Sequence, residues 1–244
     1  RSHPFSKQRL EQVKKYKLRY KNMLLKEQNV YINENLISLH YIKNKIKSYD
    51  VDPYEIIKNL ENKNDFLSNY SKLIALYRIG KYNLAEKKLS LVINKYENYP
   101  FFYELKGDIY FKKGDFNNAI KEYEKAVIAL NNVFTPSTDL IKFSLIKTHL
   151  QNNNKDSLNI SITLLEELIF NNPNWSYLWR LLSKASGKLD KKGIAYIALA
   201  EEALIKKNFI KAKKYVDLAN KQNSLPLSYK LRGSDILTRI KLHY

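Results

Sequence analysis

The stretch FFYELKGDIYFKKGDFNNAIKEYEKAVIALNN, residues 101–132, decides the fold of this chain. A second stretch, LSNYSKLIALYRIGKYNLAEKKLSLVINKYENYP, residues 67–100, repeats its pattern. Equivalent residues lie 34 positions apart, in the pairs Tyr77 and Phe111, Gly80 and Gly114, Tyr82 and Phe116, Ala85 and Ala119, and Val92 and Ala126. A fixed period of this length predicts helical hairpins that stack on one another.

Within residues 101–132, each part of such a hairpin has a suitable residue. Gly107 stands where two helices must approach closely, and KGDF, residues 113–116, forms the turn between them. Gly114 tolerates a positive φ there, and Asp115 is placed to cap the next helix. Ala119, Tyr123 and Ala126, at spacings of four and three, form the inner face of the second helix. The stretch closely resembles the tetratricopeptide repeat.

The rest of the chain has weaker copies. Residues 194–222 form a good hairpin with Ala200 and Ala203 on its first helix, Phe209 at the turn, and Ala212 and Ala219 on its second. Residues 150–159, LQNNNKDSLN, favour a lengthened loop. We expect helices at 6–27, 30–48, 53–61, 66–79, 82–96, 100–112, 116–130, 137–150, 157–171, 174–187, 192–206, 208–222 and 226–241. The fold class is therefore all-α, a tetratricopeptide-like α-solenoid of stacked antiparallel hairpins with a concave face.

Composition sets limits on function. The 244 residues carry 43 Lys and Arg against 24 Asp and Glu, a formal charge of +19. Lys is spread along the chain without a compact cluster, so we interpret the surface as diffusely basic and predict no nucleic-acid partner. The chain has no Cys, which excludes disulfides and thiolate metal sites. No stretch approaches the length of a membrane span, and no signal peptide is visible.

The residues needed for catalysis do not converge in the sequence. The 4 His have no partner His at the spacing of an HExxH zinc helix, and no Gly-rich phosphate loop or GxSxG occurs. The adjacent carboxylates Glu166–Glu167 and Glu201–Glu202 diverge around a helix, so we interpret them as solvated faces. We predict that this chain is not an enzyme, has no catalytic residue and holds no cofactor.

The concave face is the remaining candidate site, because the first helix of each tetratricopeptide hairpin lines it. In this register the predicted partner-binding residues are Tyr70, Ile74, Tyr77, Arg78, Phe101, Glu104, Leu105, Asp108, Phe111 and Lys112. Aromatic and acidic residues suit an extended peptide or a helix that carries Lys or Arg, and do not suit capture of a terminal carboxylate. Alternatively, a neighbouring domain or helix covers the aromatic rings. A third possibility, stacking of single-stranded RNA, is disfavoured by the acidic residues.

The first residues carry a further resemblance. HPFSKQRL, His3 to Leu10, resembles the segment that closes the catalytic domain of HExxH zinc metallopeptidases of family M forty-eight. In one bacterial branch, which includes the periplasmic beta-barrel assembly-enhancing proteases, a helical linker and tetratricopeptide hairpins follow. Pro53, the repeats and the closing LRGSDI, residues 231–236, are similar to that branch. The division implied is 1–29 for the end of the peptidase domain and a linker helix, 30–64 for linker helices that pack on the repeats, and 65–244 for the repeat domain.

This resemblance implies a non-catalytic, regulatory and docking region of a periplasmic zinc peptidase that acts in outer-membrane protein assembly and quality control. The implied partners are its own peptidase domain and the outer-membrane assembly machinery or its substrates, with peripheral membrane contact allowed. The resemblance implies that zinc is held elsewhere in the parent enzyme, because this chain lacks the HExxH helix. His3 is either a lid ligand, which the closing segment brings to that zinc ion, or only a hinge residue before Pro4. The chain begins at Arg1, so we expect a fragment of a longer protein. The alternative is a freestanding tetratricopeptide scaffold for protein–protein interaction.

Overall fold

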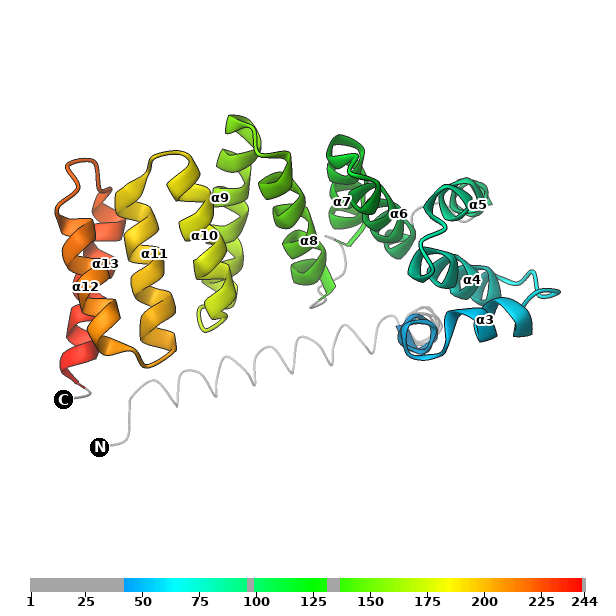
Figure 1. Ribbon diagram of the computed structural model, residues 1–244, viewed down its shortest axis with the longest axis horizontal. Coiled ribbons are helices and arrows are strands. Elements are labelled where there is room, and N and C mark those ends of the chain that lie inside the picture. The colour runs from blue at the N-terminus through cyan, green and yellow to red at the C-terminus, as the bar shows by residue number, and fades with distance from the viewer. Residues whose placement is uncertain (1–41, 96–98, 131–136, 243–244) are drawn as a thin grey trace, which may run out of the picture. The chain divides into compact units, whose positions relative to one another are not determined.

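The computed structural model describes residues 42–95, 99–130 and 137–242, and every regular element within these ranges is a helix. Residues 42–50 are helical. The helices that follow are α3 (Pro53–Asn59), α4 (Phe66–Arg78), α5 (Tyr82–Lys95), α6 (Pro100–Lys113), α7 (Phe116–Leu130), α8 (Ser137–Asn152), α9 (Lys155–Asn171), α10 (Ser176–Lys188), α11 (Lys192–Ile205), α12 (Phe209–Asn220) and α13 (Leu227–Lys241) (Figure 1). The predicted all-α fold class is confirmed, and most helix ends lie within two residues of the expected ones.

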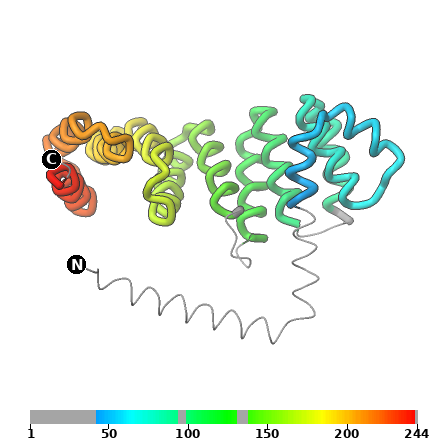
Figure 2. Tube along the Cα trace, turned by 90° about the horizontal axis from the view of Figure 1, so that it is seen from below, coloured from blue at the N-terminus to red at the C-terminus, as the bar shows by residue number. Residues whose placement is uncertain are grey.

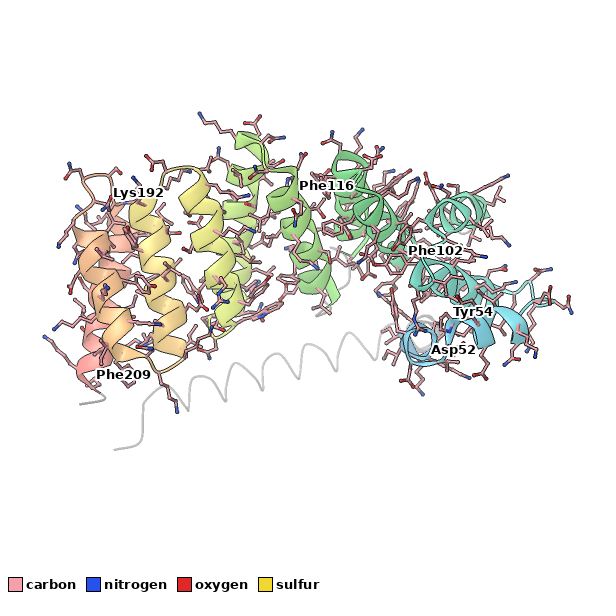
Figure 3. The ribbon with its side chains drawn as sticks, viewed as in Figure 1. Asp52, Tyr54, Phe102, Phe116, Lys192 and Phe209 are labelled. Carbon is pink, nitrogen blue, oxygen red and sulfur yellow. The ribbon has the colours of Figure 1, made fainter. Side chains whose placement is uncertain are left out.

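Contacts divide the chain into two compact units, Arg1–Lys81 and Tyr82–Tyr244. In the first unit, Asp52 caps α3 by accepting hydrogen bonds from the backbone N–H groups of Tyr54 and Glu55, at 2.9 and 3.0 Å (Figure 3). Pro53 then starts α3, at a position where a missing N–H costs nothing. The predicted boundary between residues 64 and 65 stays a prediction, and residues 1–29 lie outside the described ranges.

In the second unit, helices that are consecutive in the chain lie side by side from α6 to α12, and α13 contacts both α11 and α12. Figure 2 shows α13 next to α12 at the C-terminal end of this row. The core of the unit is made of apolar residues from neighbouring helices, including Tyr123 of α7, Leu165 of α9, Trp179 of α10 and Ile197 of α11. Each helix buries its apolar face against helices that are near it in the chain, as expected for a helical repeat.

Gly107 has the predicted role at the α6–α7 contact. A Cβ atom on Gly107 would lie 2.8 Å from two ring carbons of Tyr123, so α6 and α7 pack closely only because this position lacks a side chain. The Tyr123 hydroxyl donates a 2.6 Å hydrogen bond to the carboxylate of Asp108, which fixes the ring over Gly107.

The interhelical turns share one backbone feature. Gly80 and Gly114 have φ angles of +76° and +78°, and Asn153, Asp190 and Lys207 adopt φ angles of +59°, +57° and +58° at later turns. The predicted long loop at residues 150–159 is therefore wrong. Only Asn153 and Asn154 separate α8 from α9, because Asn153 takes the left-handed conformation and the Asn154 side chain caps α9 through a 2.8 Å bond from the Ser157 N–H.

Candidate functional site

Four of the predicted groove residues belong to the first unit, and two of them are core residues. Tyr70 and Ile74 have exposed fractions of only 1% and 0%. Arg78 is engaged within the unit, because its guanidinium donates hydrogen bonds to the backbone oxygens of Ser48, at 2.9 Å, and Val51. It thereby caps the end of the helix at 42–50. Tyr77 is half-buried, and a binding role for it stays a prediction.

The other six residues lie on α6 in the second unit. Leu105, with 2% exposure, belongs to the core, and Asp108 is held by the Tyr123 hydroxyl. Phe111 packs against Phe116 of α7 with ring centroids 5.7 Å apart. Of the other predicted residues on α6, Phe101 and Glu104 are half-buried and Lys112 is exposed. The prediction that Tyr70, Ile74 and Leu105 line an open groove is therefore wrong. A helix face that is buried against neighbouring helices cannot also line an open surface. The binding roles of the other residues are untested.

The second unit contains a pocket that the sequence did not indicate. It has a volume of about 510 Å³ and lies between α9, α10 and α13. Its lining is mainly apolar, and it consists of Glu166, Ile169, Phe170, Pro173, Trp179, Leu182, Ser228, Tyr229 and Arg232. We call it the apolar pocket. Trp179 is buried and donates a 2.9 Å hydrogen bond from its indole N–H to the Pro173 carbonyl, whereas the Phe170 side chain at the rim is 86% exposed.

The polar groups of the apolar pocket are engaged with one another and with α11. The Tyr229 hydroxyl donates to the Glu166 carboxylate. Burial, reinforced by this contact, raises the pKa of Tyr229. The Arg232 guanidinium lies 4.9 Å from the centre of the Trp179 ring and donates a 3.0 Å bond to Glu201. What the pocket offers a ligand is therefore chiefly apolar surface.

The interpretation of Glu201 and Glu202 as solvated is wrong. They are only 3% and 6% exposed. They do diverge around α11, as predicted, but each is buried against cations from other turns or helices. Glu201 pairs with Arg232 at 3.0 Å and Arg239 at 3.5 Å, both on α13. The sequence offered only a partial sign of this: Lys206 follows Glu202 by four residues, but the arginine partners of the two carboxylates belong to other helices.

Glu202 organises a second pocket, of about 340 Å³, between α10, α11 and α12. Its carboxylate accepts a 2.6 Å bond from Arg180 and a 2.5 Å bond from Lys206. Burial opposes ionisation of Glu202, but these two hydrogen bonds outweigh it and hold its pKa below the usual value. The complete lining is Arg180, Leu199, Glu202, Ala203, Lys206, Asn208, Lys211 and Tyr215. We call it the cationic pocket.

The two pockets lie on opposite sides of α10. Successive residues of an α-helix are turned by about 100°, so Arg180 points about 100° away from Trp179 and about 160° from Leu182. Trp179 and Leu182 line the apolar pocket, and Arg180 lines the cationic one. A ligand in one pocket therefore leaves the other accessible.

His149 is the one histidine among the described residues. His149 is buried in α8, and neither ring nitrogen has a hydrogen-bond partner among the described residues. Burial lowers its pKa. Within residues 42–95, 99–130 and 137–242, no three His, Asp or Glu side chains gather in a way that suits a metal ion. The proposed lid ligand His3 lies outside these ranges. Every helix in the described part of the chain is too short or too polar to span a lipid bilayer.

Comparisons with known proteins identify the fold. No family model matches the chain, and no curated protein matches it. Among solved structures, YrrB, described as a tetratricopeptide protein with an unusual peptide-binding site, has a TM-score of 0.52 at 14% identity, over 79% of this chain and 97% of YrrB. MamA from Desulfovibrio magneticus, from its residue 41 to its end, has a TM-score of 0.50 at 14% identity, over 71% of this chain and 91% of that one. The described helices of this chain therefore have the fold of a tetratricopeptide-like α-solenoid, as the repeats predicted.

Proposed function

We propose that this chain is a protein-binding module without catalysis of its own, which captures a large apolar side chain of a partner protein in the apolar pocket. The observation that carries the proposal is the exposed phenyl ring of Phe170 at the rim of a pocket with Trp179 and Leu182 in its wall. An exposed aromatic residue beside an apolar hollow is typical of a surface that a partner covers.

The chemistry of the pocket restricts the side chain that it accepts. The lining of the pocket has one cation, Arg232, which pairs with Glu201 and stacks on Trp179, and one anion, Glu166, so it has no excess of positive charge to attract a carboxylate. The Glu166 carboxylate, which accepts a bond from Tyr229, also lines the pocket and disfavours a second carboxylate beside it. We therefore expect a Leu, Met or Phe side chain in the pocket, from a segment that does not place Asp or Glu beside it.

The fold supports this proposal. A stack of helical hairpins presents a long surface to which an extended segment or a helix of a partner can bind. YrrB, which shares this fold, is described as having a peptide-binding site. Peptide binding is therefore a function that this fold accommodates.

The test is selection from a displayed library of random peptides, followed by fluorescence anisotropy on the peptides recovered. The unmodified chain should enrich peptides with a large apolar residue at a fixed position. Phe170→Ala should weaken their binding about tenfold, the loss expected for a contact residue worth more than 1 kcal/mol. Ile128→Ala is the matched control, because Ile128 on α7 is also an exposed apolar residue but does not line the pocket. Equal binding by the two variants contradicts the proposal.

The larger protein to which the module belongs is a further part of the proposal. The resemblance of residues 3–10 supports a periplasmic zinc metallopeptidase of family M forty-eight, with zinc held upstream and with the peptidase domain or the outer-membrane assembly machinery as partner. Sequencing the reading frame upstream of Arg1 tests this. An HExxH helix with a downstream Glu, preceded by a signal peptide, is the expected result. A start codon immediately before Arg1 leaves the freestanding scaffold instead.

A further inference from the structure

Within residues 99–241, the positive charge is concentrated at the C-terminal end. Residues 180–241 contain 15 Lys and Arg against 5 Asp and Glu, a net charge of +10. Residues 99–171 contain 8 Lys and Arg against 9 Asp and Glu, a net charge of −1. Two of the five acidic residues in the basic part, Glu201 and Glu202, are buried and paired. The surface formed by α10 to α13 is thus more basic than the total charge of the chain indicates.

The cationic pocket lies within this basic surface. Three cationic side chains line it, Arg180, Lys206 and Lys211, against the single carboxylate of Glu202. Glu202 already binds Arg180 and Lys206 and so holds both cations in place before any ligand arrives. The Lys211 ammonium has no hydrogen-bond or ion-pair partner among the described residues. The pocket is therefore preorganised and keeps an excess of positive charge.

The walls of the pocket indicate the kind of anion that fits. Leu199, Ala203 and the ring of Tyr215 are apolar surface beside the cations. The Tyr215 ring is itself stacked on Tyr196, with centroids 6.5 Å apart, and is thus held in place. A protein segment with an acidic residue next to an apolar residue satisfies both surfaces. A phosphate of a nucleic-acid backbone satisfies the cations but leaves the apolar wall uncovered.

We infer that the cationic pocket binds a carboxylate group of an acidic segment in a partner protein, with Lys211 as its main contact and Arg180 and Lys206 as supporting cations. Charge-assisted hydrogen bonds from guanidinium and ammonium groups to a carboxylate are the strong ones in proteins. The inference rests on the proposed protein-binding function, but it uses the opposite side of α10 from the apolar pocket. The two proposals can therefore fail separately.

The experiment measures fluorescence anisotropy with three labelled probes. The first is a short peptide of alternating Glu and Leu, blocked at both ends. The second has Gln in place of Glu and a free C-terminal carboxylate, so it separates a side-chain carboxylate from a terminal one. The third is a single-stranded oligonucleotide. We expect the first peptide to bind, and the second peptide and the oligonucleotide to bind more weakly than the first. Tighter binding of the second peptide contradicts an acidic segment as the ligand.

Lys211→Gln is the decisive variant, and Lys213→Gln is its control. Both lysines are exposed on α12, but only Lys211 lines the pocket. Loss of one charge-assisted hydrogen bond should weaken peptide binding about tenfold for Lys211→Gln and less than twofold for Lys213→Gln. Because the Lys211 ammonium has no partner among the described residues, its replacement should leave the melting temperature unchanged.

Several results overturn the inference. Equal losses for the two variants mean diffuse attraction to the basic surface, and preferential binding of the oligonucleotide means a nucleic-acid surface. Absence of binding by either peptide means that the pocket does not take a carboxylate. Phe170→Ala separates the two proposals: it should leave binding of the acidic peptide unchanged, and a loss of that binding assigns the peptide to the apolar pocket instead.

Discussion

Arg232 of α13 lies over the indole ring of Trp179 of α10, 4.9 Å from its centroid, and donates a 3.0 Å hydrogen bond to buried Glu201 of α11. One side chain therefore ties the last helix to two earlier ones. The attraction between a guanidinium and an aromatic face adds to the ion pair, and both are strengthened because Glu201 is shielded from water.

The first prediction concerns this contact. Arg232→Ala should lower the free energy of unfolding by about 2 kcal/mol, because it removes a stacking partner of Trp179 and a hydrogen bond to a buried carboxylate. Lys230→Ala, at an exposed position on the same helix, is the control and should change it by less than about 0.5 kcal/mol. Urea denaturation followed by Trp fluorescence measures both. Similar values for the two variants show that the Arg232 contact contributes no stability.

The second prediction concerns the close contact at Gly107. Gly107→Ala should destabilise the protein by about 1–3 kcal/mol, because the new Cβ overlaps the ring of Tyr123, which the bond to Asp108 holds in place. Gly187→Ala, in α10, is a matched control, because a Cβ there has no heavy atom within 4 Å. It should be neutral or stabilising by up to about 1 kcal/mol. Thermal unfolding of both variants checks the difference, and a stable Gly107→Ala variant means that α6 and α7 can separate without loss.

The third prediction concerns the left-handed turn at Lys207, where φ is +58°. A side chain strains this conformation and Gly does not, so Lys207→Gly should raise the free energy of unfolding by up to about 1 kcal/mol. Gly114, with φ of +78°, should show the opposite. Gly114→Ala should lower the free energy of unfolding by about 1 kcal/mol, since Ala must adopt the strained conformation. Chemical denaturation of the two variants measures both changes in the free energy of unfolding. Changes of the same sign contradict this account of the turns.

The fourth prediction concerns pH. Burial lowers the pKa of His149 below its ordinary value of 6.5, so the unfolded chain binds more protons than the folded one as the pH falls below that value. The free energy of unfolding should therefore fall as the pH drops through about 6.5 towards about 5.5. Glu202, whose pKa is also lowered, adds a loss only at more acidic pH, near and below its ordinary value of 4.5.

His149→Leu tests the source of this pH dependence. The substitution keeps the site apolar and removes the titrating group, so the slope between about pH 7.5 and about pH 5.5 should disappear while the protein stays folded. Urea denaturation at several pH values measures the slope. A variant that keeps the slope of the unmodified chain shows that another group is responsible.

The helices could be predicted from the sequence because their signals are local. The 34-residue period, the turn at Gly114 and the small residue at Gly107 all depend on neighbours within one hairpin. The turn at Asn153 was missed, because Asn can take the left-handed conformation without the Gly that normally marks it. The polar residues 150–159 were therefore wrongly predicted to form a long loop.

The pockets could not be predicted, because they depend on residues far apart in the chain. Tyr229 reaches Glu166 across 63 positions, and Arg232 reaches Glu201 across 31. Helical periodicity places Glu201 and Glu202 on different sides of α11, but it does not show which neighbours carry the cations. The predicted groove failed at Tyr70, Ile74 and Leu105 for a related reason: periodicity identifies an apolar face without showing whether another helix covers it.

The adjacent carboxylates of α11 also specify the register of that helix. A slip of one residue would carry Glu202 towards α13 and bring Ala203 to face Arg180, leaving the guanidinium without its acceptor and a carboxylate surrounded by the wrong neighbours. The apolar face of α11 opposes the same slip, because a shift of one residue turns the helix by about 100°. In this protein, two adjacent charged residues therefore favour one alignment of α11 with its neighbouring helices over the alignment shifted by one residue.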